Sequence, residues 1–386
     1  MRKNKPIVAI LAIIFLLVGC AENPQTTEQE HKLILTSAYS GEEVDVIHPR
    51  LREYLTLTEE NEICSFLSKY SETDFSKPRY TLTWETTYAE NYTVQIGQDQ
   101  SLIESYNFVT SETSLSVGWL CPGEQYYWKV TASSGEDSAI GSFKVKDEPI
   151  RTLDIDGVGN VRDIGGWTTE SGKRVKYGLI YRGGRLNGKI SDAGKETMTD
   201  VLNIKTELDL RGTSDDGGQI ACEFSQNGNY VKIPLAQYAR ILPEYTGYSK
   251  NSKQAIADIF TALADENNYP MYIHCNWGAD RTGTICFLIN GLLGVSYQDL
   301  TKDFETTSFS TSGKRWRDNI KNGSFEGSGI MQNDSNNFVA WDYTYRLLLK
   351  NYAQEGDSLS EAIETYLLSC GVTATQIQSV KGMLLE

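Results

Sequence analysis

Hydrophobic and polar positions follow three different patterns along the 386 residues of the chain. Residues 7–18 form an unbroken apolar run. Between about residues 33 and 147, short runs of alternating character are separated by turn-rich stretches. From about residue 150 onward, the sequence contains both buried-strand and helix patterns. These patterns predict a targeting segment, then a small all-β unit, then a larger α/β unit.

The first twenty residues have the pattern of an export signal. Three basic residues precede an apolar run that is too short to span a bilayer comfortably. The run ends in LVGC, which resembles the lipobox of bacterial lipoproteins. This resemblance implies that residues 1–19 are a lipoprotein signal peptide and that Cys20 is lipidated, with a plain signal peptide or a short anchor as the alternative. We therefore expect an exported protein that is lipid-anchored to a bacterial membrane, with the outer membrane (its periplasmic face or the cell surface) as the expected site, through a flexible tether at residues 20–32.

The all-β prediction for residues 33–147 rests on three strand-like runs, at residues 80–84, 92–96 and 126–130. The string LCPGEQY, which ends at Tyr126, resembles the L-x-P-G-x-x-Y of fibronectin type III domains. That resemblance implies a β-sandwich with Trp84 in its core and with the Tyr126 hydroxyl closing a corner onto the backbone. Residues 33–77, with a short helix predicted at 59–70, fit this pattern poorly. The unit could be a spacer or a binding module, and we favour the spacer.

The most informative string is HCNWGADRTG, at residues 274–283. An apolar run before it predicts a buried strand, and the sequence TGTICFLINGLLG predicts a helix that ends at Gly294. The loop between them lies at a strand end and a helix N-terminus. There, free N–H groups and the helix dipole favour a bound anion.

A cysteine at this position can serve as a nucleophile. A helix N-terminus and a nearby cation lower the pKa of a thiol from about 8.5 to about 3.5–7.5. Cys275 would then attack a bound phosphate, Arg281 would bind two phosphate oxygens through its planar fork, and Thr282 could donate to the sulfur. The residues expected to bind the phosphate are Asn276, Trp277, Gly278, Ala279, Asp280 and Arg281.

The C-x5-R spacing alone is weak evidence, but H-C-x-x-G-x-D-R-T-G resembles the phosphate-binding loop of the cysteine-dependent phosphatases. The Asp before the Arg is similar to the atypical bacterial tyrosine phosphatases, the family that includes the secreted mycobacterial protein tyrosine phosphatase B. Three other segments agree, namely NVRDIGG at 160–166, YRGGRL at 181–186 and ELDLR at 207–211. The resemblance covers residues 150–386. It implies a tyrosine phosphatase domain with a cysteine-phosphatase fold, in which a central, mostly parallel sheet is flanked by helices.

Several positions depart from or refine this resemblance. Lipid-active members often carry Lys where this chain has Ala279, which weakens a phosphoinositide interpretation. Trp277 replaces a small residue and could stack on a phenyl ring or pack against a helix. His274 is expected to support the loop. Arg162 and Asp163 are expected to form a supporting ion pair, with a direct phosphate contact by Arg162 as the alternative.

The general acid is less well defined. Many cysteine phosphatases carry an Asp on a mobile loop before the cysteine, but the corresponding stretch IPLAQYARILPEY has none. The resemblance to the atypical family implicates Asp280, which we rank first. Asp209 ranks second, although it could instead hold Arg211 or Arg182 in a salt bridge. Glu244 ranks third.

Composition narrows the functional classes. A net charge of −15 opposes binding to a nucleic-acid backbone. Three scattered histidines, with no C-x-x-C or H-E-x-x-H, predict no metal site and no cofactor. The sequence predicts a phosphatase that hydrolyses phosphotyrosine, with dual specificity included, in a phosphorylated protein or a small phosphomonoester, through a phosphocysteine intermediate. The alternatives are inositol phosphates or phosphoinositides as substrates, and a non-catalytic exported binding lipoprotein.

Overall fold

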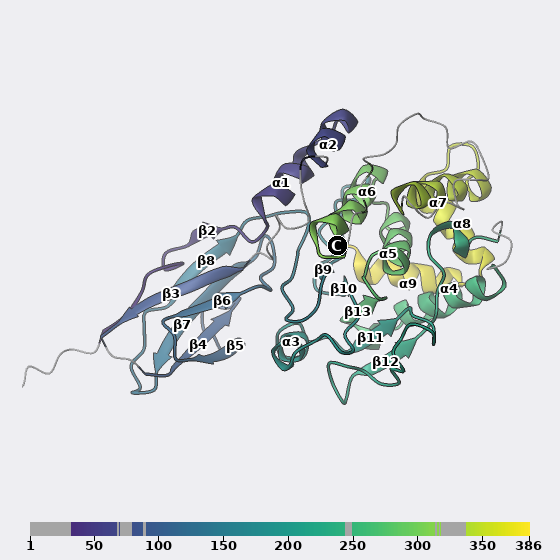
Figure 1. Cartoon of the computed structure of the whole chain (residues 1–386). Helices are drawn as coiled ribbons and strands as arrows, with labels where there is room; N and C mark the ends of the chain where they lie inside the picture. Colours follow the sequence, from purple (N-terminus) through teal and green to yellow (C-terminus); the bar gives the residue numbers. More distant parts are fainter. Residues whose placement is uncertain are drawn as a thin grey trace, which may run out of the picture.

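The computed structural model describes residues 32–67, 69, 79–87, 90–243, 249–312, 315, 317 and 337–386. The predicted signal peptide, Cys20 and Glu244 lie outside these residues. An all-strand part lies beside a part that mixes strands and helices (Figure 1). The predicted α/β character of the C-terminal part is therefore confirmed. In the described ranges, no helix has the length and apolar character needed to cross a membrane.

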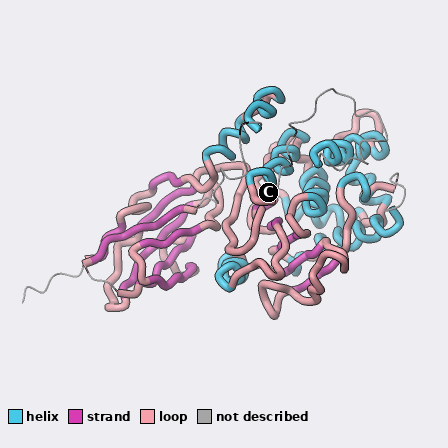
Figure 2. Tube along the Cα trace, in the orientation of Figure 1, coloured by secondary structure: helices cyan, strands magenta, loops and turns pink. Residues whose placement is uncertain are grey.

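The all-strand part is built from strands joined by loops (Figure 2). These strands form two sheets, with strand orders β1-β3-β6 and β2-β8-β7-β4-β5. Both sheets contribute to one core, where the rings of Trp84 and Trp128 lie 6.4 Å apart. The Tyr126 hydroxyl accepts a hydrogen bond from the Cys121 amide at 3.0 Å, as the predicted corner requires. The strands are β1 (Leu33–Leu35), β2 (Glu42–Val44), β3 (Tyr80–Thr86), β4 (Tyr92–Gly97), β5 (Ser105–Thr110), β6 (Ser114–Val117), β7 (Gln125–Ala132) and β8 (Gly141–Val145).

The mixed part is built on a sheet of order β12-β11-β13-β10-β9, in which only β9 is antiparallel to its neighbour. All four residues of the central strand β13 are buried, as expected for a strand covered on both faces. Parallel β10, β13 and β11 all end at the same edge, where the predicted loop begins. The strands are β9 (Arg162–Asp163), β10 (Ile180–Gly183), β11 (Thr206–Asp209), β12 (Asn229–Lys232) and β13 (Met271–His274).

The two faces of this sheet belong to different cores. Ile180 and Ile273 pack into the core formed with most of the helices, whereas Tyr181 and Tyr272 pack into the core that continues into the all-strand part. The alternation of side chains along a strand produces this division. The helices are α3 (Asp192–Glu196), α4 (Ser249–Leu263), α5 (Asp280–Leu292), α6 (Tyr297–Thr306), α7 (Asn337–Tyr352), α8 (Leu359–Ser369) and α9 (Ala374–Leu384).

Two helices early in the chain, α1 (Pro49–Thr56) and α2 (Glu60–Leu67), belong to the larger core rather than to the sheets that surround them in sequence. They follow one another end to end (Figure 1), and we call them the N-terminal helices. The Tyr54 hydroxyl donates to Glu305 of α6, and Lys302 donates to the Leu55 carbonyl at 2.5 Å. The tyrosine ring also lies 5.2 Å from that of Phe309. These helices explain why residues 49–67 do not follow the fibronectin pattern.

A chain that starts at residue 150 is expected to be unstable, because it lacks the N-terminal helices. Leu51, Tyr54, Ile63 and Phe66 are all buried, and each such side chain contributes about 1.5–3 kcal/mol on burial. Their sum is comparable with the whole free energy of unfolding of a typical domain, about 5–15 kcal/mol. Thermal unfolding of chains 150–386 and 32–386 tests this. Equal melting temperatures and equal solubility would contradict it.

Candidate active site

The predicted strand–loop–helix unit is present. Strand β13 ends at His274, the loop follows, and α5 begins at Asp280 with Ala279 as its N-cap residue. Cys275 lies at the base of the loop with 3% of its surface exposed. Gly278 has a φ of 65°, and a Cβ at this position would collide with the backbone of Gly183 on the neighbouring strand. The loop therefore requires glycine there for both its conformation and its close approach to β10.

Two side chains hold the backbone of the loop from behind. Asn160 donates to the Trp277 carbonyl at 3.0 Å, and Arg182 donates to the Gly278 carbonyl at 2.9 Å. In a trans peptide the N–H points opposite to the C=O. The amides of Gly278 and Ala279 are therefore directed away from these donors, which leaves them free to bind an anion.

A buried carboxylate organises both donors. Asp303 of α6 accepts from Arg162 at 2.9 Å and from Arg182 at 2.6 Å, and Arg162 in turn donates to Asn160 at 2.6 Å. Burial alone would raise the pKa of the Asp303 carboxyl, but the two guanidinium groups outweigh burial and leave this pKa below its ordinary value. Asp303 is thus an anion at neutral pH that fixes the phosphate loop through two arginines.

Asp303→Asn is expected to lower the free energy of unfolding by about 3–5 kcal/mol at neutral pH, because it leaves two buried arginines without their counter-charge. A carboxyl with a lowered folded-state pKa contributes stability that is lost as the pH falls through that pKa. The difference between native and variant chains should therefore shrink in acid. Urea unfolding at several pH values measures both effects. Asp192→Asn, at an exposed ion pair with Lys195, is the control, and an equally small loss in both variants would refute the prediction.

The predicted ion pair between Arg162 and Asp163 is wrong. Neighbouring residues of a strand point to opposite faces, so the two side chains of β9 separate. Asp163 instead accepts from Arg151 at 3.4 Å and from the amides of Gly165 and Gly178 at 2.9 and 2.6 Å. Arg162 is 1% exposed and lies beneath the loop, which it supports through its hydrogen bond to Asn160.

Two further predicted residues lie beneath the loop. The His274 ring contacts Glu207 at 2.9 Å and the Cys275 carbonyl at 3.2 Å. Asp209 is fully buried and accepts two bonds of 2.9 Å from the Arg211 guanidinium. Burial alone would raise the pKa of the Asp209 carboxyl. Arg211 and the nearby His274 outweigh burial, so this pKa lies below its ordinary value. Of the two arginines considered from sequence, Asp209 pairs with Arg211.

The structure adds a residue that the sequence did not single out. Asp215, in the loop after β11, accepts from Arg281 at 2.6 Å and from Asn276 at 2.9 Å. Burial would lower the pKa of the Arg281 guanidinium, but the bond to Asp215 outweighs it and raises this pKa. An incoming phosphate must share or take over these two donors. The acidic SDD run at residues 214–216, soon after the DLR strand, was the available sequence signal.

Asp280, the first choice for the general acid, is held on the other side of the loop. Its carboxylate accepts from Arg315 at 2.8 and 3.0 Å and from the Tyr238 hydroxyl. Burial, together with the adjacent Asp280, places the pKa of the Tyr238 hydroxyl well above its ordinary value, so this group is a hydrogen-bond donor. Both carboxylate oxygens of Asp280 are therefore engaged by Arg315, and one of them also by Tyr238.

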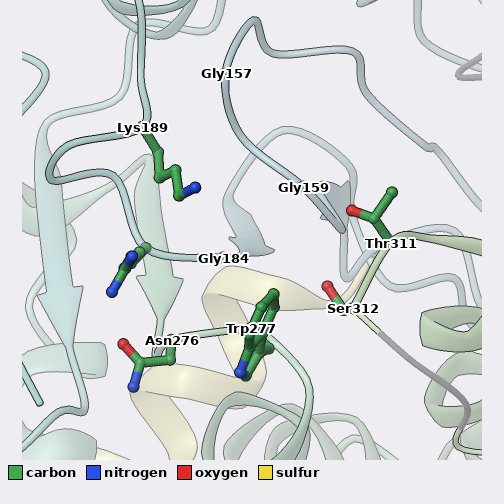
Figure 3. Close-up of a pocket in the computed structure, with 9 residues that line it drawn as sticks. Gly157, Gly159, Gly184, Lys189, Asn276, Trp277, Thr311 and Ser312 are labelled. Carbon is green, nitrogen blue, oxygen red and sulfur yellow. The ribbon is translucent and has the colours of Figure 1, made fainter.

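Two residues of the loop region, Thr282 and Trp277, have groups that a ligand or a reaction intermediate could engage. The Thr282 hydroxyl is buried without a hydrogen-bond partner among the described residues, so the expected bond to the sulfur is not formed here. Trp277 is 59% exposed and stands at the rim of a pocket (Figure 3). More than half of this residue is therefore accessible to a ligand. The described residues contain no cluster of three or more His, Cys, Asp or Glu side chains that could hold a metal.

This geometry agrees with the family to which the chain is related. Residues 153–386, more than half of the sequence, match the profile of the tyrosine phosphatase family. The chain belongs to this family.

Individual relatives are distant. The chain is 22% identical to a tyrosine-protein phosphatase of Nostoc commune over 218 residues, 51% of this chain and 71% of that protein. A protein of Cupriavidus necator, named as a candidate tyrosine-protein phosphatase, is 25% identical over 171 residues, and the match spans 39% of this chain and 61% of the relative's length. The catalytic core of the PP-IP phosphatase SIW14 from S. cerevisiae aligns with a TM-score of 0.26 at 16% identity, covering 35% of this chain and 76% of that one.

Proposed function

We propose that this member of the tyrosine phosphatase family hydrolyses phosphotyrosine, including dual-specificity activity towards phosphoserine and phosphothreonine. The observation that carries the proposal is the position of Cys275 at the base of a loop with outward-directed amides, with Arg281 on the first turn of the following helix. This arrangement suits a phosphate dianion and a nucleophile that attacks it from below.

In the proposed reaction the Cys275 thiolate attacks phosphorus and forms an S–P bond, while the P–O bond to the leaving group breaks. A carboxylic acid donates its proton to the departing oxygen. Water then attacks the phosphocysteine, which releases inorganic phosphate and regenerates the thiolate. Arg281 exchanges Asp215 for phosphate oxygens, and loop amides stabilise the charge that develops on them. The Thr282 hydroxyl, which has no hydrogen-bond partner among the described residues, is suited to stabilise the sulfur when it leaves.

A substrate panel tests this proposal. Purified chain 20–386 is assayed with phosphotyrosine, phosphoserine and phosphothreonine peptides and with inositol phosphates, with and without a chelator. We expect hydrolysis of phosphotyrosine peptides at the highest kcat/KM, with no loss in chelator. Activity on inositol phosphates alone would replace the proposed substrate, and activity that requires an added divalent metal would refute the mechanism.

We also propose that the protein is exported and lipid-anchored at Cys20, with the β unit as a fibronectin type III-like spacer. The support is the basic and apolar pattern that ends in LVGC. Cys20→Ala is expected to move the protein from the membrane fraction to the soluble fraction, because the acyl chains supply the anchor. Fractionation with mass spectrometry of the mature N-terminus measures this. Unchanged membrane association and an unmodified cysteine would overturn it.

A further inference from the structure

A pocket beside the phosphate loop combines an aromatic rim with positive charge (Figure 3). Asn276 and Trp277 of the loop form one side, and Arg185 and Lys189 come from the segment that follows β10. No carboxylate is among its lining residues. The pocket thus shares Asn276 and Trp277 with the phosphate loop, and its charged side chains are positive although the net charge of the whole chain is −15.

The two cations differ from the arginines that hold the phosphate loop. The arginines around the loop are all engaged with carboxylates, as shown by Arg162, Arg182 and Arg281. Arg185 and Lys189 are exposed, and in the described part of the chain neither side chain has a carboxylate within ion-pair distance. In an acidic chain, such charge beside a phosphate loop raises the local concentration of anions.

The backbone that carries these cations is fixed to the phosphate loop. The Arg185 amide donates to the Asn276 carbonyl at 3.2 Å, and the Gly184 amide donates to the Gly159 carbonyl at 2.9 Å. A Cβ at Gly157 would collide with the Lys189 carbonyl, so the chain segments here pack at backbone contact. The backbone positions of Arg185 and Lys189 are thus fixed relative to the phosphate loop, while their long side chains can change conformation.

We propose that Arg185 and Lys189 form a second anion site, which binds a carboxylate or phosphate that the substrate carries next to its scissile phosphate. The inference rests on the proposed function and specifies its substrate as a phosphotyrosine peptide with an acidic neighbouring residue. The exposed Trp277 ring favours this source, because it can stack on the phenyl ring while the flanking carboxylate reaches the cations. Ala279 gives the loop itself no cation for this purpose.

The test compares kcat/KM for two phosphotyrosine peptides that differ only in flanking glutamates or alanines, and for an inositol bisphosphate against a monophosphate. We expect the wild-type chain to prefer the acidic peptide roughly tenfold at low salt, as two partly exposed ion pairs allow. The preference should fall as salt is added. In the double variant Arg185→Gln, Lys189→Gln the ratio should approach one. Lys205→Gln, at another exposed lysine, is the matched control and should keep the wild-type ratio.

The outcomes separate the two proposals. Equal hydrolysis of both peptides by wild-type and double-variant chains would keep the phosphotyrosine activity and overturn the second anion site. A preference that depends on Arg185 and Lys189 only in the inositol pair would support the site and assign its anion to a second phosphate. Hydrolysis of neither peptide would overturn the proposed function, and the peptide-binding site with it.

Discussion

Cys275→Ser is expected to abolish turnover of p-nitrophenyl phosphate while the variant still binds phosphate esters. A serine hydroxyl does not supply an anion at neutral pH as a thiol can, whereas the loop amides and Arg281 remain in place. Loss of a nucleophile in covalent catalysis costs several orders of magnitude in kcat. Steady-state kinetics, with calorimetric titration of the variant by a phosphate ester, measures both parts.

Cys286→Ser is the matched control for this change. Cys286 lies one and a half turns along α5 in the same core, and burial raises the pKa of its thiol to about 11. The Cys286 thiol should therefore stay protonated and take no part in the reaction. The Cys286→Ser chain should keep near wild-type activity. A Cys275→Ser chain that retains more than a small fraction of activity would disprove the nucleophile assignment. A wild-type chain with no activity on any phosphate ester would favour the non-catalytic binding lipoprotein.

Asp280→Asn is expected to slow phosphotyrosine hydrolysis by about 10²–10⁴-fold, the usual contribution of general acid catalysis. An activated aryl phosphate, whose leaving group needs little protonation, should be slowed much less. The asparagine can still accept from Tyr238, so the loop should keep its shape. Measuring kcat for both substrates gives the leaving-group dependence. Equal slowing of both, with weaker phosphate binding, would mean that Asp280 only shapes the loop.

The same measurement on Asp215→Asn, Asp209→Asn and Glu244→Gln compares the alternatives. Asp215 is the strongest competitor, because its carboxylate already contacts both Arg281 and Asn276 of the loop. Asp209 is buried and paired with Arg211, so its loss should act on stability more than on leaving-group dependence. A leaving-group effect confined to one of these variants would move the role of the acid to that residue.

The sequence predicted the features that are formed by neighbouring positions, and it missed the contacts between side chains that are far apart in the chain. Strand β13, the loop with Gly278 and helix α5 are contiguous, so their pattern could be read directly. Asp303 lies 141 residues from Arg162, and no local pattern indicates that these side chains meet. The wrong ion pair between Arg162 and Asp163 could have been avoided from the sequence, because neighbouring residues of a strand point to opposite faces. Asp215 was missed because it lies in a loop whose course is set by tertiary packing, and Arg315 because its partner Asp280 is 35 positions away.

The N-terminal helices have a consequence for the order in which this chain can fold. Tyr54 and its partner Glu305 are separated by 251 positions. At the usual rate of synthesis, about 5–20 residues per second, roughly 10–50 s pass between their emergence from the ribosome. During that interval Leu51, Ile63 and Phe66 have no core to enter, while the strands on either side of them can already pair. The chain must therefore keep an apolar helical segment unassembled on a finished β unit until its last third has been made, and a chaperone that binds such segments would find its target in residues 49–67.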